Sequence, residues 1–163
     1  MMKRIVTKIG DIFCVDVGDN HKRYFQYIAN DLHQLNSSTI RVFKTKYPLD
    51  VEPNMEDIVA DEVDFYSHTI LKFGIQENAW IKVGKSKNVG SFDSIMFRST
   101  NDYSSSCLKS YHWYVWKLGQ EESTHIGELT EEYANMTDYG GVYNYEWIVE
   151  RIKTGRYPCA MPY

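Results

Sequence analysis

The sequence predicts an α+β fold that is mainly β: a strongly twisted antiparallel sheet, or a partly open barrel, with a short helix and a C-terminal helix packed on it. Short apolar segments separated by Gly and Asn turns dominate the chain, and aromatic residues, which favour strands, make up 15% of it. No linker-like tract interrupts the 163 residues. We therefore expect residues 1–163 to form a single domain.

The N-terminal part predicts a three-stranded antiparallel meander. Residues 10–17 read as a strand that is apolar on both faces, and Gly18-Asp19-Asn20 is a turn signal. Residues 23–29 give a second strand rich in aromatic side chains. A further turn at 36–38 leads to a third strand at 39–43. Turns this short join antiparallel strands, because a parallel crossover needs a longer connection.

The middle of the chain has weaker signals. Pro48–Pro53 predict a loop, and Asn54 is a suitable N-cap for a short helix that begins with acidic residues. Apolar and aromatic character returns at 65–75 and predicts a strand, since the last apolar side chains of this segment alternate. Residues 84–88 predict a basic turn, and 94–98 a short strand.

The C-terminal part predicts a hairpin followed by the helix with the strongest sequence signals. Residues 111–118 and 124–129 read as its two strands, and Gly140-Gly141 interrupts the chain. Asn144 fits the N-cap of the helix and Gly155 its C′ position. The apolar positions follow the helical i, i+3, i+4, i+7 spacing: Tyr145, Ile148, Val149 and Ile152.

Charge is sorted by segment. Residues 47–71 hold seven carboxylates and residues 118–150 hold eight, with no Lys or Arg in either stretch, although the net charge of the chain is only −4. The second stretch also contains tyrosines and a tryptophan. Such a surface suits a basic protein partner, whereas it repels a phosphate backbone, so we predict no nucleic-acid partner. The alternative is a solubilising loop whose tyrosines cover the sheet.

This stretch supplies the predicted partner-binding residues. They combine carboxylates for pairing with cationic side chains and aromatic rings for desolvated contacts. They are Glu128, Glu131, Glu132, Tyr133, Asp138, Tyr139 and Tyr143.

No motif predicts catalysis or a cofactor. The three cysteines are too few and too scattered for a disulfide framework or a CxxC metal site. His125 and Glu128 would point to opposite faces of a strand, so we expect no metal site there. Gly84-Lys85-Ser86 lacks the first glycine of a phosphate-binding loop, and Cys107 with His112 has no local signature of an activated thiol. We predict no catalytic residues, no metal and no cofactor.

The N-terminal residues contain basic side chains without the apolar core of a secretory signal, and no apolar run reaches the length of a membrane span. We expect a cytoplasmic protein with no membrane partner.

Four segments of the chain carry a resemblance to a known family: Lys8–Val15, Arg23–Ile28, Ile40–Phe43 and Val63–Tyr66. They resemble the immunity protein 26 family, which comprises small cytoplasmic antidotes of bacterial polymorphic-toxin and contact-dependent inhibition systems. The likeness extends to the basic turn near Gly84 and to the end of the C-terminal helix. The resemblance implies an all-β or α+β fold, no catalysis, and a function of binding and blocking a cognate toxin.

The first hypothesis is therefore an immunity protein that occludes a toxin domain, with a basic nuclease as the expected toxin. A second hypothesis is a β domain that binds a small ligand or a glycan, using Tyr111, Trp113 and Trp116 as a stacking platform. It requires these rings to line an open groove.

Overall fold

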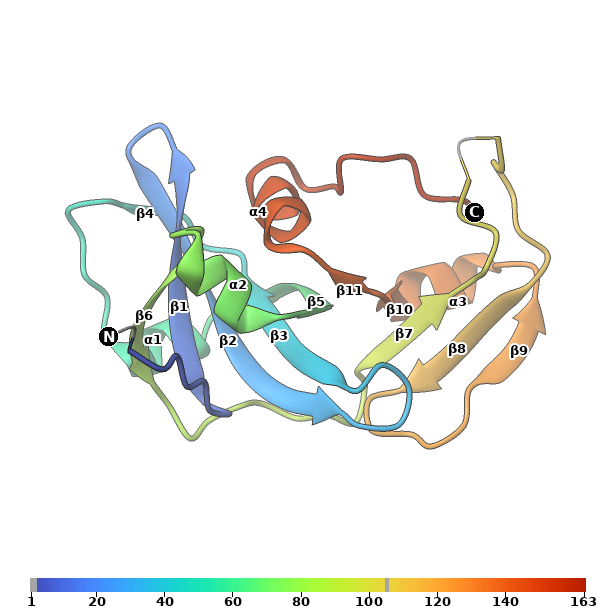
Figure 1. Cartoon of the computed structure of the whole chain (residues 1–163), viewed down its shortest axis with the longest axis horizontal. Coiled ribbons are helices and arrows are strands. Elements are labelled where there is room, and N and C mark those ends of the chain that lie inside the picture. The colour runs from blue at the N-terminus through green and yellow to red at the C-terminus, as the bar shows by residue number, and fades with distance from the viewer. Residues whose placement is uncertain (1–2, 105) are drawn as a thin grey trace.

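The computed structural model describes residues 3–104 and 106–163 and shows two sheets side by side along the long axis of the molecule (Figure 1). The larger sheet has the order β11-β5-β3-β2-β1-β6, with β4 paired to β2. Its strands are β1 (Asp11–Gly18), β2 (His21–Asp31), β3 (Ser37–Phe43), β4 (Tyr47–Pro48), β5 (Val63–Thr69), β6 (Ile81–Lys85) and β11 (Val142–Tyr143).

The smaller sheet has the order β10-β7-β8-β9. Its strands are β7 (Met96–Ser99), β8 (Trp113–Lys117), β9 (Thr124–Gly127) and β10 (Thr137–Tyr139). The helices are α1 (Met55–Val59), α2 (Leu71–Gln76), α3 (Glu131–Met136) and α4 (Tyr145–Thr154). The predicted class, α+β and mainly β, is confirmed, and the larger sheet is open because β11 and β6 lie at its two ends.

The predicted N-terminal meander is confirmed. β1 pairs with β2 and β2 with β3, both antiparallel. Asp19 and Asn20 both have positive φ, 52° and 59°, as a two-residue hairpin turn requires. Phe13 lies opposite Phe25, and their rings stack with centroids 5.2 Å apart.

The C-terminal helix packs on the larger sheet as predicted. Ile148 and Ile152 of α4 are buried in one cluster with Phe13 and Phe25. At the start of the helix, Asn144 accepts a hydrogen bond from the backbone N–H of Trp147 (2.9 Å). Gly155 follows its end with a φ of 86°. Asn54 caps α1 in the same way as Asn144 caps α4.

Some predicted boundaries were wrong. The strand expected at 65–75 ends at Thr69, and Leu71–Gln76 is helical. Leu71 and Gly74, which are three positions apart, are the buried residues of this helix, because the Trp80 ring packs against Gly74 and its Nε1–H donates to the Leu71 carbonyl (3.0 Å). The basic turn begins later than expected, since β6 continues to Lys85. The loop predicted from Pro48 begins within β4.

Residues 137–143 connect the two sheets. β10 pairs with β7 in parallel, and β11 pairs with β5 in parallel. The predicted interruption at Gly140-Gly141 is where the chain passes from one sheet to the other. A Cβ atom at Gly140 would collide with the Trp116 ring, so glycine is required for this close approach.

Candidate protein-binding surface

α3 carries three of the predicted residues, two of which are exposed. Its N-cap is Thr130, whose hydroxyl accepts a hydrogen bond from the N–H of Tyr133 (3.2 Å). Glu131 and Glu132 occupy the first turn, where a carboxylate is electrostatically favourable, and both are exposed. Neither forms an ion pair within residues 3–104 and 106–163. Tyr133 is half-buried on the same helix.

Glu128 precedes α3 and follows β9. Its Oε1 lies 2.9 Å from Lys109 Nζ, and both side chains are exposed. An exposed ion pair contributes little to stability, so Glu128 can exchange Lys109 for another cation at small cost.

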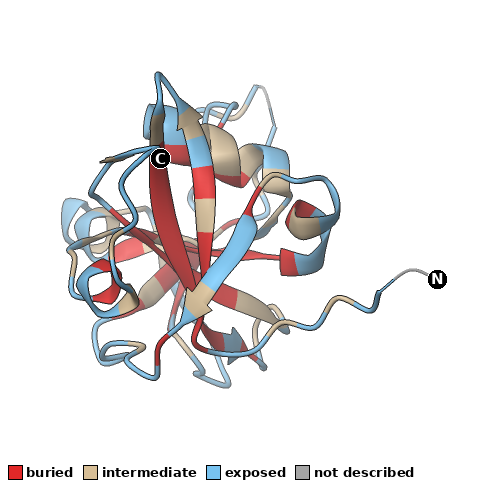
Figure 2. Cartoon of the chain, turned by 90° about the vertical axis from the view of Figure 1, so that its left-hand side faces the viewer, coloured by how far each residue is buried: buried red, intermediate tan, exposed pale blue. Residues whose placement is uncertain are grey.

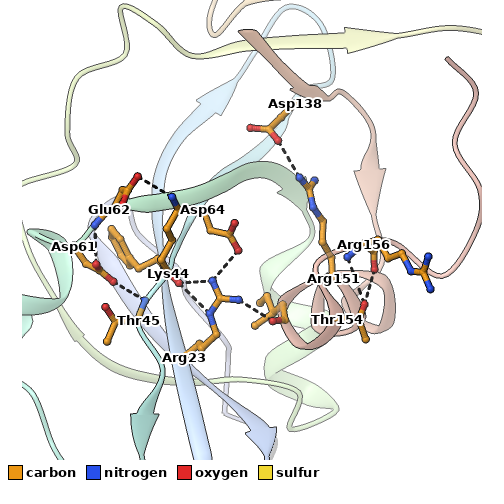
Figure 3. A network of polar contacts seen from close by, with 12 residues as sticks. Arg23, Lys44, Thr45, Asp61, Glu62, Asp64, Asp138, Arg151, Thr154 and Arg156 are labelled. Carbon is orange, nitrogen blue, oxygen red and sulfur yellow. Dashed lines mark hydrogen bonds and ion pairs between the residues drawn. The ribbon is translucent and has the colours of Figure 1, made fainter. Parts of the chain in front are cut away.

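Asp138 does not face an external partner. Its Oδ1 lies 3.1 Å from Arg151 Nη2 (Figure 3). Its Oδ2 accepts the backbone N–H of Tyr66 (3.0 Å). Burial raises the pKa of Asp138, while the hydrogen bond from Tyr66 and the charge of Arg151 oppose that rise. The expectation that Asp138 belongs to an exposed acidic patch is therefore wrong, because the chain's own arginine already pairs with it.

Tyr139 and Tyr143 also pack inward. The Arg98 guanidinium lies 4.1 Å from the centroid of the Tyr139 ring. The ring centroids of Tyr143 and Tyr157 are 4.2 Å apart. Burial raises the pKa of Tyr143, because the charged phenolate is disfavoured away from water. Both residues serve mainly as packing. Tyr133 is the predicted tyrosine that shares an element with the exposed carboxylates.

The first acidic stretch is largely engaged by polar groups of the chain itself (Figure 3). Glu62 pairs with Lys44 (2.7 Å), and Asp64 pairs with Arg23 (2.8 Å). Asp61 accepts the backbone N–H of Thr45 (2.8 Å). The sequence did not reveal these pairings, because each partner of these carboxylates lies outside the segment that lacks Lys and Arg.

The predicted aromatic platform is absent from the surface. Trp113 and Trp116 are buried, which leaves Tyr111 as its exposed member. The Trp116 Nε1–H donates to Asp31 (2.9 Å). The two tryptophans therefore stabilise the core and offer no open face for a sugar or a base.

An apolar groove of about 690 Å³ lies elsewhere, between the loop after β7, the start of α4 and the C-terminal segment. Leu108, on its rim, is 70% exposed. Tyr163 donates its backbone N–H to the Leu108 carbonyl (3.0 Å) and its carbonyl accepts the N–H of Ser110 (2.8 Å), which holds the C-terminal segment in place. Sequence reasoning missed this groove, since its walls come from three distant segments. They include Tyr103, Leu108, Val142, Tyr143, Trp147 and Met161, and the described lining has no charged side chain.

Among the described residues, no group of three or more His, Cys, Asp or Glu side chains is placed to hold a metal ion. No described helix has the length and apolar character needed to cross a membrane. Comparison of the chain with protein-family models, with curated proteins and with solved structures found no match.

Proposed function

We propose that this chain is an immunity protein that binds and occludes a cationic toxin domain through the α3 surface, defined as Glu128, Glu131, Glu132 and Tyr133. The observation that carries the proposal is the exposure of Glu131 and Glu132 without a cationic partner in the described chain, whereas Asp138, Asp64 and Glu62 are paired. A cytoplasmic location follows from the same proposal, since an antidote must meet the toxin inside the cell.

The chemistry of the α3 surface suits a basic partner. Its carboxylates attract Lys and Arg side chains and accelerate encounter, while Tyr133 and the exposed Met136 supply apolar contact area. A nuclease is the toxin class we favour, because its active-site surface is basic in order to bind phosphate groups. Covering that surface would block substrate access without any catalytic residue in the antidote.

Contacts of Asp138 and Arg98 hold α3 against the rest of the protein. Asp138 ties β10, which follows α3 directly, to α4 and β5 through Arg151 and Tyr66. Arg98 Nη1 donates to the carbonyl oxygens of Thr137 (2.6 Å) and Ala134 (3.4 Å) at the C-terminal end of α3. These contacts hold α3 in place before a partner arrives, which lowers the entropic cost of binding.

The test starts from the gene immediately upstream of the gene for this chain, where the proposal predicts a secreted protein with a toxic C-terminal domain. We expect this domain to form a complex with the chain and to lose its toxic activity. In the variant with Glu131→Gln and Glu132→Gln, the complex should dissociate about tenfold more readily, because two interfacial ion pairs are lost.

The matched control carries Glu121→Gln and Glu122→Gln, two exposed carboxylates in the β8–β9 turn that give the same change in net charge. The control should bind as the parent does. Equal affinity of the α3 variant and the parent would reject the α3 surface. Failure of the parent to bind the toxin domain would reject the immunity function with it.

A second candidate function is the binding of a neutral apolar small molecule in the groove beside Trp147. The volume of about 690 Å³ falls in the range of small-molecule sites, and the described lining has no charged side chain. A neutral aromatic probe such as naphthalene should quench part of the tryptophan fluorescence of the parent, the part that comes from Trp147. It should leave the fluorescence of a Trp147→Phe variant unchanged. An identical response from both proteins would exclude the groove as its site.

A further inference from the structure

A second groove, of about 910 Å³, is lined in part by β6 and α1. These two elements lie at the opposite end of the long axis from α3 (Figure 1). The segment 6–11, strand β6 and the turn after it, and Glu56 of α1 form its walls. Four lysines line it: Lys8, Lys82, Lys85 and Lys87. We call this site the basic groove.

The charges of the basic groove do not cancel. Asp11, which is 1% exposed, accepts the backbone N–H of Lys8 (2.8 Å) and pairs with Lys82 Nζ (2.9 Å). Glu56 accepts the hydroxyl hydrogen of Ser86 (2.9 Å). Four lysines against these two carboxylates leave a net charge of +2. Within the described residues, the ammonium groups of Lys8, Lys85 and Lys87 pair with no carboxylate.

The floor of the basic groove is rigid. The buried Gln26 side chain donates to the carbonyl oxygens of Gly10 (3.2 Å) and Ser86 (3.1 Å). Ser86 also donates its backbone N–H to Gly10 (3.0 Å). Gly10 has a φ of 103°, and a Cβ atom there would lie 2.7 Å from the Ser86 carbonyl oxygen, so only glycine fits. A ligand therefore meets a preformed wall.

The strand that lines the groove is an edge strand. β6 is the last strand of the larger sheet, and in the described structure its outer edge pairs with no other strand. Figure 2, which views the molecule from this end, shows β6 at the front and exposed along most of its length. Val6 and Ile9, which are 57% and 53% exposed, add apolar surface to the wall.

These features select one kind of partner. Lysines on an edge strand repel a second copy of the same edge, and they attract an acidic chain. The described lining contains no aromatic ring, whereas grooves for single-stranded nucleic acid present rings on which bases stack. Apolar side chains beside cations suit a polypeptide whose acidic residues are interspersed with apolar ones.

We propose that the basic groove binds an extended acidic segment of a partner protein. The carboxylates of this segment pair with Lys8, Lys85 and Lys87, and the apolar side chains of the segment contact Val6 and Ile9. This interface is separate from the α3 surface and does not depend on the proposed immunity function.

The probe is a short fluorescein-labelled peptide in which glutamate alternates with valine, added to the full chain. We expect saturable binding by fluorescence anisotropy, with slower amide hydrogen exchange in residues 6–11 and 82–88. A peptide in which serine replaces valine should bind more weakly, since it loses the contacts with Val6 and Ile9. An oligonucleotide of equal charge should also bind more weakly.

A charge-reversed variant locates the site. Lys85→Glu with Lys87→Glu should weaken binding of the glutamate–valine peptide by about tenfold, as expected for two rim ion pairs. The matched control is Lys46→Glu with Lys72→Glu, two exposed lysines outside the groove, and it should bind as the parent does. Circular dichroism checks that both variants fold.

The proposal is overturned by any of three results: no saturable binding of the glutamate–valine peptide, equal binding of the oligonucleotide, or equal weakening in both lysine variants. The first result would mean that the lysines only protect the edge of β6 from pairing. The other two would mean that the attraction is non-specific.

Discussion

Asp138 and Arg151 form an ion pair between β10 and α4, with 3.1 Å between Oδ1 and Nη2. The second carboxylate oxygen accepts the backbone N–H of Tyr66 in β5. In the described structure, the short strand β11 pairs only with His68 and Thr69 of β5, so it does not cover Tyr66. The Arg151 guanidinium also lies 3.9 Å from the centroid of the Phe65 ring. One carboxylate thus joins the smaller sheet, the edge of the larger sheet and the C-terminal helix.

Replacing Asp138 with alanine should destabilise the protein strongly. The change leaves the largely buried Arg151 without its counter-ion and the Tyr66 N–H without its acceptor, and breaking such a pair costs about 3 kcal/mol. Urea denaturation measures the loss in the free energy of unfolding. Glu131→Ala, at an exposed position, should change it by less than about 0.5 kcal/mol. Similar small losses in both variants would show that the Asp138 contacts contribute little.

Asp31 predicts a specific acid sensitivity. Burial favours its neutral form, but hydrogen bonds from His68 (3.0 Å) and Trp116 (2.9 Å) outweigh burial and hold the pKa of Asp31 below its ordinary value. A carboxyl whose pKa is lower in the folded state stabilises the fold above its unfolded pKa, about 4, and this contribution is lost as the pH falls from there through the lower pKa of the folded state.

The stability difference between the parent and Asp31→Asn should therefore shrink between about pH 5 and pH 2. Denaturation midpoints measured across this range provide the test. Asp93→Asn, an exposed control, should follow the parent at every pH. A difference for Asp31→Asn that stays constant with pH would contradict the assigned pKa direction.

Local sequence signals predicted much of this fold. The Gly18-Asp19-Asn20 turn and the caps Asn54, Asn144 and Gly155 act through neighbouring residues, so each can be read without knowing the tertiary structure. β10 and β11 have only three and two residues and pair in parallel with distant strands. Strands this short have no periodicity to detect.

The candidate surface was predictable only in part, for a similar reason. The charge pattern located Glu131 and Glu132 but assigned Asp138 to the same patch. The partner of Asp138, Arg151, lies just beyond the stretch without cations and contacts it only once α4 has packed on the sheet. An ion pair of this kind depends on tertiary geometry, which counts of charge along the chain do not contain.

Gly74→Ala should destabilise the protein although it raises helix propensity. Alanine in place of glycine within a helix is worth about 1 kcal/mol. However, the new methyl group would overlap the Trp80 ring, and such overpacking costs about 2 kcal/mol. Thermal denaturation should show a lower melting temperature, and a simultaneous Trp80→Phe change should make the combined loss smaller than the sum of the two. Gln76→Ala, at an exposed position of α2, should have almost no effect. A more stable Gly74→Ala variant would show that the Trp80 ring moves aside freely.

The proposed complex should form more slowly as salt is added. Glu131 and Glu132 are exposed, so their attraction for a cationic toxin acts through solvent and is screened over a Debye length of about 8 Å at physiological ionic strength. Stopped-flow association rates should fall as sodium chloride rises, and they should fall less steeply for the variant with Glu131→Gln and Glu132→Gln. The Glu121→Gln, Glu122→Gln control should keep the parent's slope. Parallel slopes for all three proteins would mean that the steering charge lies elsewhere, because only residues near the encounter surface change the salt dependence of association.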